Sequence, residues 1–217
     1  MSQTSTPVFE PDCRQCPRLA TFLDQVADKH PDYHARPVAA FGDPQARLLI
    51  VGLAPGMHGA NATGRPFTGD YAGILLYQTL YDHGYGSCPQ SVARDDGLVL
   101  SGARITNAVK CLPPQNKPQL DEVKQCNGYL RAEIDALPEA PVILALGKLA
   151  HDAILRALGL KLSAYPFGHA QVHDLGDSLT LVDSYHCSRY NTQTRRLTAD
   201  MFGEVFDIAA TLLARQA

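Results

Sequence analysis

The sequence lacks any long apolar run, since no stretch within its 217 residues reaches the ~18 consecutive apolar residues of a membrane-spanning helix. The segment 1–7 is polar and contains no apolar core of a secretion signal. These two absences predict a soluble, cytoplasmic protein that binds no membrane. Strong positive charge is also missing, because the formal net charge is −3. A nucleic-acid coat over the whole surface is therefore disfavoured, but a local basic groove is not, because local charge determines a binding face.

Signs of a multidomain organisation are missing as well. The sequence shows no internal repeat, no low-complexity run and no clear linker. Hydrophobic residues make up 45% of the chain, which is enough for one sizeable core at this length. We therefore expect a short flexible tail over residues 1–12 and a single domain over residues 13–217. Nothing in the sequence requires a partner subunit, so we expect a monomer.

Short apolar runs alternate along the chain with segments of helical spacing. Strands are predicted over residues 47–52, 105–109, 141–146 and 179–184, and helices over 14–29, 70–83, 118–134, 147–158 and from 198 onward. This alternation indicates an α/β protein with a mostly parallel sheet that helices cover on both faces. Ligands bind such sheets beyond the carboxyl ends of the strands. We therefore expect the richest loops to meet at one edge of the sheet: residues 54–69, 107–117 and 185–196.

The six cysteines stand in a chain without a secretion signal, which points away from disulfides and toward metal or redox chemistry. Cys13 and Cys16 form one close pair, and Cys111 and Cys126 form a second, more widely spaced pair. Two such pairs can supply four thiolates to one soft metal centre. By spacing alone, zinc and an iron–sulfur cluster are equally compatible, and any single cysteine is better explained as a small buried hydrophobe. Two cysteines fit neither pair and are expected to bind no metal: Cys88 and Cys187.

The first loop combines many turn residues with an aromatic ring. Phe67 lies between turn residues, an unusual place for an aromatic unless a ligand stacks on it. The glycines of the loop allow the backbone to approach a ligand closely. The spacing does not match a phosphate-binding P-loop, which disfavours nucleoside triphosphate hydrolysis. Asp70 stands at the start of the following helix, where an N-cap is the simplest explanation.

The other two loops supply amide, imidazole and basic side chains. Asn107, at a strand end, carries both a donor and an acceptor and can bind the edge of a pyrimidine. For a single Asn, however, a turn residue bonded to its own backbone is the commoner explanation. The segment 184–197 gathers His186, Tyr190 and three arginines. Basic and aromatic residues together suit contact with phosphates and bases, and a solvated polar turn explains the same composition equally well.

Taken together, these motifs resemble the uracil-DNA glycosylase superfamily, and most closely its fifth, or B-type, branch of bacterial and archaeal iron–sulfur enzymes. The similarity runs from Cys13 to about Leu197. Its segments follow in the same order as in that branch: residues 52–55, 63–70, 107–117 and the turn that contains His186. The resemblance implies a three-layer α/β/α sandwich around a central four-stranded, mostly parallel sheet. It also implies that four cysteines hold a 4Fe–4S cluster: Cys13, Cys16, Cys111 and Cys126.

The resemblance further implies a monofunctional DNA glycosylase that flips uracil out of DNA and hydrolyses its N-glycosidic bond in base-excision repair. It suggests that other deaminated bases, such as hypoxanthine, are accepted as well. In the chemical step, Asp70 is expected to stabilise the sugar cation and orient the water, with Asn61 helping to hold that water. His186 is expected to donate to the carbonyl oxygen of the leaving base.

The remaining candidates bind the base or the DNA backbone. Phe67 is expected to stack on the extruded base and Asn107 to bond its polar edge, with the backbone of Gly52 and Ala54 close by. Tyr190 is the candidate wedge in the vacated stack. The other candidate DNA contacts are Arg189, Asn191, Arg195 and Lys117.

Two departures from the branch and two other functions stay open. Cys187 stands where relatives usually have Pro, which would loosen the turn that aims His186, and Ala62 stands where they often have Arg, which would remove a phosphate or cluster-side contact. A zinc- or cluster-stabilised protein that binds uracil in DNA without catalysis is one alternative. A small-molecule hydrolase on the same fold is the other, and it predicts no affinity for DNA.

Overall fold

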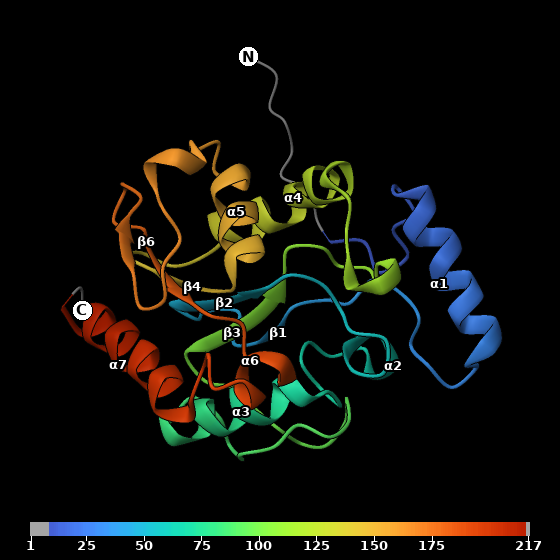
Figure 1. The fold of residues 1–217 in the computed structure, drawn as a ribbon, viewed down its shortest axis with the longest axis horizontal. Coiled ribbons are helices and arrows are strands. Elements are labelled where there is room, and N and C mark those ends of the chain that lie inside the picture. The colour runs from blue at the N-terminus through green and yellow to red at the C-terminus, as the bar shows by residue number, and fades with distance from the viewer. Residues whose placement is uncertain (1–8, 216–217) are drawn as a thin grey trace.

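The fold is built on one six-stranded sheet with the strand order β1-β3-β2-β4-β6-β5, in a computed structural model that describes residues 9–215 (Figure 1). The four central strands run parallel to one another. They are β2 (Leu48–Gly52), β3 (Ala103–Asn107), β4 (Val142–Leu146) and β6 (Thr180–Ser184). The four-stranded parallel centre is thereby confirmed, whereas most of the expected tail over residues 1–12 lies outside the described residues.

Two short edge strands complete the sheet and were not predicted. β1 (Phe41–Gly42) pairs antiparallel with β3, and β5 (Val172–Asp174) pairs antiparallel with β6. With 2 and 3 residues, they are too short to show the period-two alternation by which a strand is recognised in a sequence. The sheet is therefore mixed at its edges and parallel only in its centre.

Helices cover both faces of the sheet, so the expected three-layer sandwich is confirmed. Successive side chains of a strand point to opposite faces, and the apolar runs are buried along their whole length because both faces are covered. Leu49 and Ile143 face one core cluster, and Leu48 and Leu144 face the other. The first cluster is closed by α1 (Pro17–Lys29), α4 (Leu120–Asp135) and α5 (Lys148–Ala157). The second is closed by α3 (Tyr71–Asp82) and α7 (Ala199–Arg215).

Several boundaries differ from the sequence-based ones for local reasons. The second strand ends at Asn107 rather than residue 109, although the next two backbone N–H groups still donate to the carbonyls of Gly52 and Leu53. α1 begins at Pro17, which suits the first helical turn because proline has no N–H to leave unpaired. α4 begins after a capping box made by Gln119 and Glu122. Within α3, which the apolar spacing predicts with Ile74 on its inner face, Ile74 is instead 66% exposed.

Two short helices lie in the loops at the carboxyl ends of the strands: α2 (Ala60–Thr63) and α6 (Arg189–Gln193). The remaining helical turns are of the 3-10 type, at Pro114–Asn116 and Leu162–Ala164. Thr198 caps α7, because its side-chain oxygen accepts from the backbone N–H of Met201 at 3.2 Å. Across residues 9–215, every helix is too short or too polar to cross a bilayer.

Candidate active site

A cavity of about 540 Å³ lies beyond the carboxyl ends of the parallel strands. Residues that follow β2, β3, β4 and β6 line it, together with the first residues of α3 and α5. The three loops predicted to converge therefore do so at one edge of the sheet. Six of the predicted site residues line this cavity: Ala54, Phe67, Asp70, Asn107, His186 and Arg189.

Phe67 and Asn107 meet above Gly52, at the floor of the cavity. A Cβ atom on Gly52 would lie 2.4 Å from Oδ1 of Asn107 and 2.6 Å from Cζ of Phe67, so only glycine fits beneath them. Asn107 is the last residue of β3 and is paired with Gly52 across the sheet. Its Oδ1 atom is buried without a hydrogen-bond partner. A buried acceptor without a partner is costly unless a ligand supplies the donor.

The ring of Phe67 is held in an unusual backbone conformation. Its φ of +55° is in the left-handed region, which bulky residues rarely adopt. A buried polar network holds the neighbouring residues: Tyr77 donates to the carbonyl of Pro66 at 2.7 Å, and Arg65 pairs with Asp96 at 2.6 Å. Burial alone would raise the pKa of Asp96, but hydrogen bonds from Arg65 and from backbone N–H groups lower it. Such strain persists only where the surroundings fix the backbone.

Asp70 caps α3 and also borders the cavity. Its Oδ1 atom accepts from the backbone N–H of Gly73 at 2.9 Å, which confirms the N-cap. Its Oδ2 atom is turned toward Gly56 and Gly59, and a Cβ on Gly59 would approach it to 2.6 Å. Burial raises the pKa of Asp70, against the lowering effect of hydrogen bonds from Gly73 and Ala72. The Oδ2 atom of Asp70 therefore does not cap α3 and lies beside Gly56, which lines the cavity.

His186 faces Phe67 across the cavity, with ring centroids 6.0 Å apart and planes tilted by 31°. Burial lowers the pKa of its imidazole to about 4, so the ring is neutral at physiological pH. The turn that carries it is fixed by Asn191, whose Nδ2 donates to the carbonyl of His186 at 2.8 Å. Cys187, next to His186 in this turn, is fully buried in the core.

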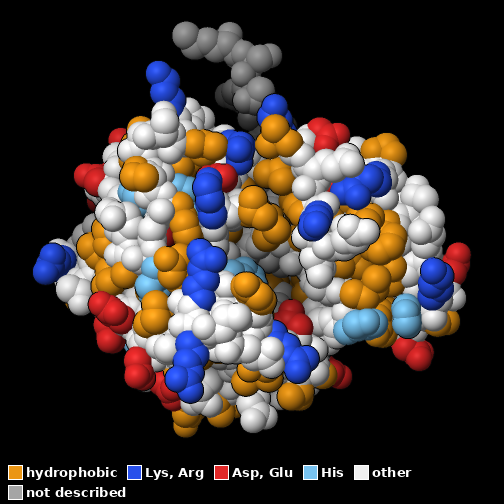
Figure 2. Space-filling view, in the orientation of Figure 1, with side chains coloured by type: hydrophobic (Ala, Val, Ile, Leu, Met, Phe, Trp, Pro, Cys, Tyr) orange, Lys and Arg blue, Asp and Glu red, His pale blue; other side chains and the backbone are white. Residues whose placement is uncertain are grey.

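The candidate DNA contacts lie around the cavity or beyond it. Arg189 lines the cavity, and its guanidinium lies 5.7 Å from the centroid of the Tyr71 ring. Tyr190, Arg195 and Lys117 are exposed but do not line the cavity. Figure 2 shows that Lys and Arg side chains gather over α5 and α6, beside a hollow in the middle of this face. A local basic face therefore exists despite the negative total charge.

The other candidates contact the cavity only in part. Gly52 is buried beneath the two side chains described above, and Ala54 lines the cavity directly. Asn61 is fully buried next to the lining residue Ala60, and neither polar atom of its amide has a partner in the protein. Its expected role in holding water stays a prediction, although an unpartnered buried amide is where an ordered water binds.

Among the lining residues that had not been singled out from the sequence are Asn116, Lys148 and Leu149. Asn116 has a φ of +57° and follows Gln115, whose φ is +58°. Two consecutive non-glycine residues in the left-handed region are a sign of strain that the local sequence Pro-Gln-Asn does not reveal. Lys148 and Leu149 begin α5, where they look like an ordinary polar residue and an ordinary core residue.

The four paired cysteines line one cavity between α1 and α4, together with Lys110 and Tyr129. Burial raises the pKa of Cys111 to about 12 and that of Cys16 to about 11, and the neighbouring thiols add to both shifts. A bound cation is what would keep such thiols deprotonated. Within residues 9–215, no three of the sulfur atoms approach within 4.8 Å of one another. A tetrahedral zinc site with Zn–S bonds of about 2.3 Å would require sulfur atoms roughly 3.8 Å apart.

A second group with metal-binding side chains lies beneath β6. His151, His173 and Asp183 are buried, and their donor atoms lie within 4.8 Å of one another. Each carboxylate oxygen of Asp183 bonds to a different ring, at 2.7 Å to His151 Nδ1 and at 3.1 Å to His173 Nε2. The other nitrogen of His151 bonds to the carbonyl of Tyr165 at 2.9 Å. These hydrogen bonds link Tyr165, His151, Asp183 and His173 in one network. The network holds β6, the strand that leads to His186.

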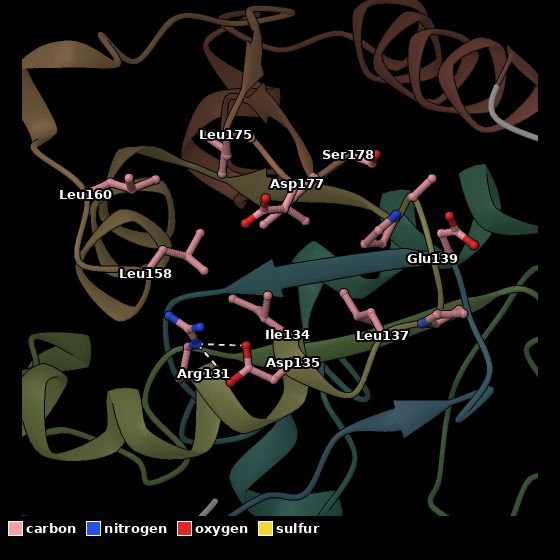
Figure 3. A pocket seen from close by; sticks show the side chains of 15 residues that line it. Arg131, Ile134, Asp135, Leu137, Glu139, Leu158, Leu160, Leu175, Asp177 and Ser178 are labelled. Carbon is pink, nitrogen blue, oxygen red and sulfur yellow. Dashed lines mark hydrogen bonds and ion pairs between the residues drawn. The ribbon is translucent and has the colours of Figure 1, made fainter. Parts of the chain in front are cut away.

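Another cavity of about 540 Å³ lies at the opposite, amino-terminal ends of β4 and β6 (Figure 3). Figure 3 shows leucine side chains, including Leu158 and Leu175, around a space that Asp177 and Glu139 border. Arg131 is engaged by Asp135 at 2.7 Å. Carboxylates around an apolar floor repel phosphate. The cavity at the carboxyl ends, with its neutral imidazole and nearby arginine, is therefore the better candidate for DNA.

Comparisons with known proteins agree with this arrangement. The family model of the Uracil DNA glycosylase superfamily matches residues 39–210. The Type-5 uracil-DNA glycosylase of Thermus thermophilus is 48% identical over 198 residues, covering 89% of this chain and 90% of that protein. The Type-5 uracil-DNA glycosylase of Pyrobaculum aerophilum is 41% identical over 203 residues, covering 92% of this chain and 88% of that protein.

A solved structure supports the architecture independently. The crystal structure of wild-type SMUG2 of Pedobacter heparinus superposes with a TM-score of 0.51 and covers 96% of this chain and 94% of its own. The two sequences are 13% identical. At that identity the likeness shows the fold alone.

Proposed function

The chain belongs to the uracil-DNA glycosylase superfamily, and on this basis we propose that it excises uracil from DNA by hydrolysing the N-glycosidic bond, as the first step of base-excision repair. One observation supports this proposal above the others: an acid, an imidazole, an amide and an aromatic ring from three loops line one cavity. The similarity to Type-5 uracil-DNA glycosylases over most of the chain supports uracil as the base.

We propose that the extruded base lies against Phe67 and bonds to Asn107. The Phe67 ring forms a wall of the cavity, and base–aromatic stacking contributes about 1–3 kcal/mol. The Oδ1 atom of Asn107 has no partner in the protein, so it is available to accept the ring N–H of uracil. Glycine at position 52 leaves the space in which these two side chains approach the base. The ring N–H that uracil offers would satisfy a buried acceptor that the fold leaves open.

Asp70 and His186 would act on the two charges that develop when the glycosidic bond breaks. The bond between the sugar C1′ and the base nitrogen cleaves, which leaves positive charge on the sugar and negative charge on the base. The outward oxygen of Asp70 would stabilise the sugar and orient the attacking water, which adds to C1′ and gives up its proton to this carboxylate; that proton finally neutralises the departing uracil anion. Neutral His186 would donate an N–H to the carbonyl oxygen of the departing base.

The basic residues at the rim would grip the DNA backbone. Arg189 lines the cavity, whereas Arg195 and Lys117 are exposed outside it. Phosphate contacts position the duplex, and the flipped base is read inside the cavity. We propose that Asn191 acts differently, because its side chain already bonds to the backbone of His186. Its contribution would then be the aim of His186, with no direct contact to phosphate required.

We propose that the four-cysteine cavity holds a 4Fe–4S cluster with a structural role. Four thiols line one cavity, with Cys111 and Cys126 buried and Cys13 and Cys16 half-buried. Bound there, the cluster would join residues 13–16 to the loop at Cys111 and to α4 at Cys126. Lys110, next to Cys111, is buried and its ammonium bonds to Glu133 at 2.7 Å. The same carboxylate accepts from Thr106 at 2.8 Å, so this network also holds the end of β3 that carries Asn107.

Release of free uracil from a uracil-containing oligonucleotide tests the proposed function. We expect Asp70→Asn and His186→Ala each to lower the single-turnover excision rate by at least about tenfold, or about 1.4 kcal/mol, while DNA binding persists. Wild-type protein that binds such DNA without releasing the base would instead support the non-catalytic alternative. Unchanged rates in both variants would remove these residues from the chemistry.

Four sequence-based expectations remain predictions. A panel of oligonucleotides, each with one modified base, tests whether hypoxanthine and other deaminated bases are excised alongside uracil. Light scattering tests the expected monomer, and cell fractionation tests the expected cytoplasmic location. Salt titration of DNA binding tests the expected phosphate contacts, since each contact adds to the slope.

A further inference from the structure

A buried pair of an imidazole and a carboxyl group lies beneath the strand that leads to His186, and the proposed chemistry does not use it. The side chains of His151 and Asp183 are 1% and 0% exposed, so both are shielded from bulk solvent. Nδ1 of His151 lies 2.7 Å from Oδ1 of Asp183, and Nε2 lies 2.9 Å from the carbonyl oxygen of Tyr165. Both ring nitrogens of His151 therefore face oxygen atoms.

The carboxyl group of Asp183 is itself surrounded by nitrogen atoms. Its Oδ2 atom lies 3.1 Å from Nε2 of His173 and accepts from the backbone N–H of Gly168 at 3.3 Å. An ionised carboxylate has only acceptor sites, which matches these neighbours. A neutral imidazole carries one N–H, so it would leave one nitrogen of His151 with its lone pair against an acceptor. The imidazolium carries two N–H groups and satisfies both contacts.

We infer that His151 is held as a buried imidazolium, and that its ion pair with Asp183 positions the turn that carries His186. Asp183 lies on β6, three residues before His186. Its backbone N–H donates to the carbonyl of Gln171 at 2.9 Å, so the pair joins α5 to β6 and to the segment 165–171. The link to His186 rests on the proposed function, whereas the protonation of His151 does not.

The segment 165–171 also contacts the residue directly before His186. The backbone N–H of Tyr185 donates to Nδ1 of His169 at 3.2 Å, and the two rings stack with their centroids 4.9 Å apart. The carboxylate of Asp183 accepts from the residue that precedes His169 in the same segment. Loss of the ion pair would therefore be passed to His186 through groups that are already in contact.

The charges around His151 favour its protonated form. Burial alone would lower the pKa of the imidazole, but the hydrogen bond and the charge of Asp183 raise it above its ordinary value, and Asp152 adds to the rise. Asp152 is in turn paired with Lys148 at 2.8 Å. Two further titratable side chains belong to this ring cluster: His173 and Tyr165. The stability contributed by the pair is therefore full below the unfolded pKa of about 6.5, and is lost as the pH rises through the folded pKa.

Long-range ¹H–¹⁵N spectra of protein labelled with ¹⁵N-histidine test the protonation directly. At about pH 7.5, where a histidine of ordinary pKa is mostly neutral, we expect one ring with two protonated nitrogens. Its signals should disappear in His151→Gln and persist in the control His30→Gln, which changes the C-cap of α1. In Asp183→Asn the same ring should be neutral, which keeps the test decisive if His151→Gln does not fold.

Two results would overturn the protonation. One is a neutral His151 ring in the wild-type spectrum. The other is the loss of one bound metal ion per chain in His151→Gln, because a metal ion would then occupy the place of the proton between His151 and Asp183.

Single-turnover excision and urea unfolding, measured from about pH 7 to 9, test the link to His186. At about pH 7 we expect His151→Gln to excise uracil at least about fivefold more slowly than wild type, with DNA affinity within about twofold, because the turn is misplaced and the phosphate contacts remain. Both the rate ratio and the gap in urea midpoint should narrow as the pH rises, since wild type then loses the same proton.

The outcomes separate this inference from the proposed function. A wild-type excision rate in His151→Gln, or a rate ratio that does not change with pH, would overturn the positioning role. Wild-type protein that releases no uracil from DNA would remove the proposed function, while the histidine spectra would still decide the protonation of His151.

Discussion

Burial shifts the pKa values of Asp70 and His186 in opposite directions, in both cases toward the neutral form. The carboxyl pKa is raised, and the imidazole pKa is lowered to about 4. The proposed chemistry needs the carboxylate and the neutral imidazole. At neutral pH the imidazole of His186 is already uncharged, so the chemistry requires only that Asp70 stays anionic. The position of Asp70 at the N-terminus of α3 favours its anionic form.

The pH dependence of excision follows from these shifts. Toward acid pH, the rate should fall as Asp70 takes up a proton, because burial raises the pKa of its carboxyl group. His186 should add no inflection until the pH approaches about 4. Single-turnover rates measured from neutral pH downward should therefore show a fall, the acidic limb of the pH profile, that belongs to Asp70 in wild type. In Asp70→Asn the limb should vanish along with most of the rate.

A limb that survives in Asp70→Asn would contradict this assignment. A histidine with an ordinary pKa would produce an inflection near 6.5 that belongs to His186. The variant His186→Gln separates the two cases, since it removes the imidazole and leaves Asp70 in place. Its rate should be low, and its acidic limb should match that of wild type.

The principal site residues could be predicted because each is a chemically distinctive side chain just beyond or at the end of an apolar strand or at the start of a helix. Asn107 and His186 are of this kind, and Phe67 is an aromatic among turn residues. The contributions of Lys148 and Leu149 could not be predicted, because both sit in an ordinary amphipathic helix. Only the placement of the start of α5 beside His186 shows that these two side chains reach the cavity.

At the scale of elements, the loop that carries Phe67 depends on a buried ion pair. Arg65 and Asp96 are almost fully buried, and the guanidinium also lies 4.3 Å from the centroid of the Phe41 ring. The same guanidinium donates to Ser91 at 3.0 Å, which in turn bonds to Thr68 at 2.7 Å. The loop between α3 and β3 is thereby tied to the two residues that flank Pro66 and Phe67.

Arg65→Gln should therefore destabilise the protein and lower excision together. Loss of one partner from a buried ion pair costs about 3–5 kcal/mol, because the other charge stays buried without compensation. Urea unfolding measures that loss, and Phe67 should become poorly fixed in the native fraction. The control Tyr77→Phe removes one hydrogen bond to Pro66 and should cost about 1 kcal/mol. If Arg65→Gln unfolded at the wild-type urea concentration, this network would not be what holds the loop.

The parallel strands and the long helices could be predicted because their patterns extend over enough residues. Each central strand is a run of apolar side chains buried on both faces, and each long helix has a buried stripe. The edge strands β1 and β5 could not be predicted, because they are too short to show the alternation of apolar and polar side chains that marks a strand. The exposed side chain of Ile74 was misplaced for a different reason: α3 is apolar on most of its circumference, so its inner face is not marked by sequence alone.

At the scale of the whole molecule, the four-cysteine centre would join parts of the chain that lie far apart in sequence. We expect Cys111→Ala to lower the yield of folded protein and to abolish the brown colour of a 4Fe–4S protein. Cys88→Ala is the matched control, because Cys88 lies in the loop between α3 and β3, away from the four. Ultraviolet–visible spectra with iron and zinc analysis provide the measurement. A colourless Cys111→Ala protein with full yield and full activity would show that the centre has no structural role. Zinc instead of iron in the wild-type protein would contradict the 4Fe–4S assignment.

The central claim is that Asp70, His186, Asn107 and Phe67 surround a single extruded base. A crystal structure of the slow Asp70→Asn variant with a uracil-containing duplex tests it most directly. We expect the uracil ring against Phe67, its N–H directed at Oδ1 of Asn107, and a carbonyl oxygen within hydrogen-bond distance of His186. Uracil left in the helical stack, or bound elsewhere on the protein, would contradict the account.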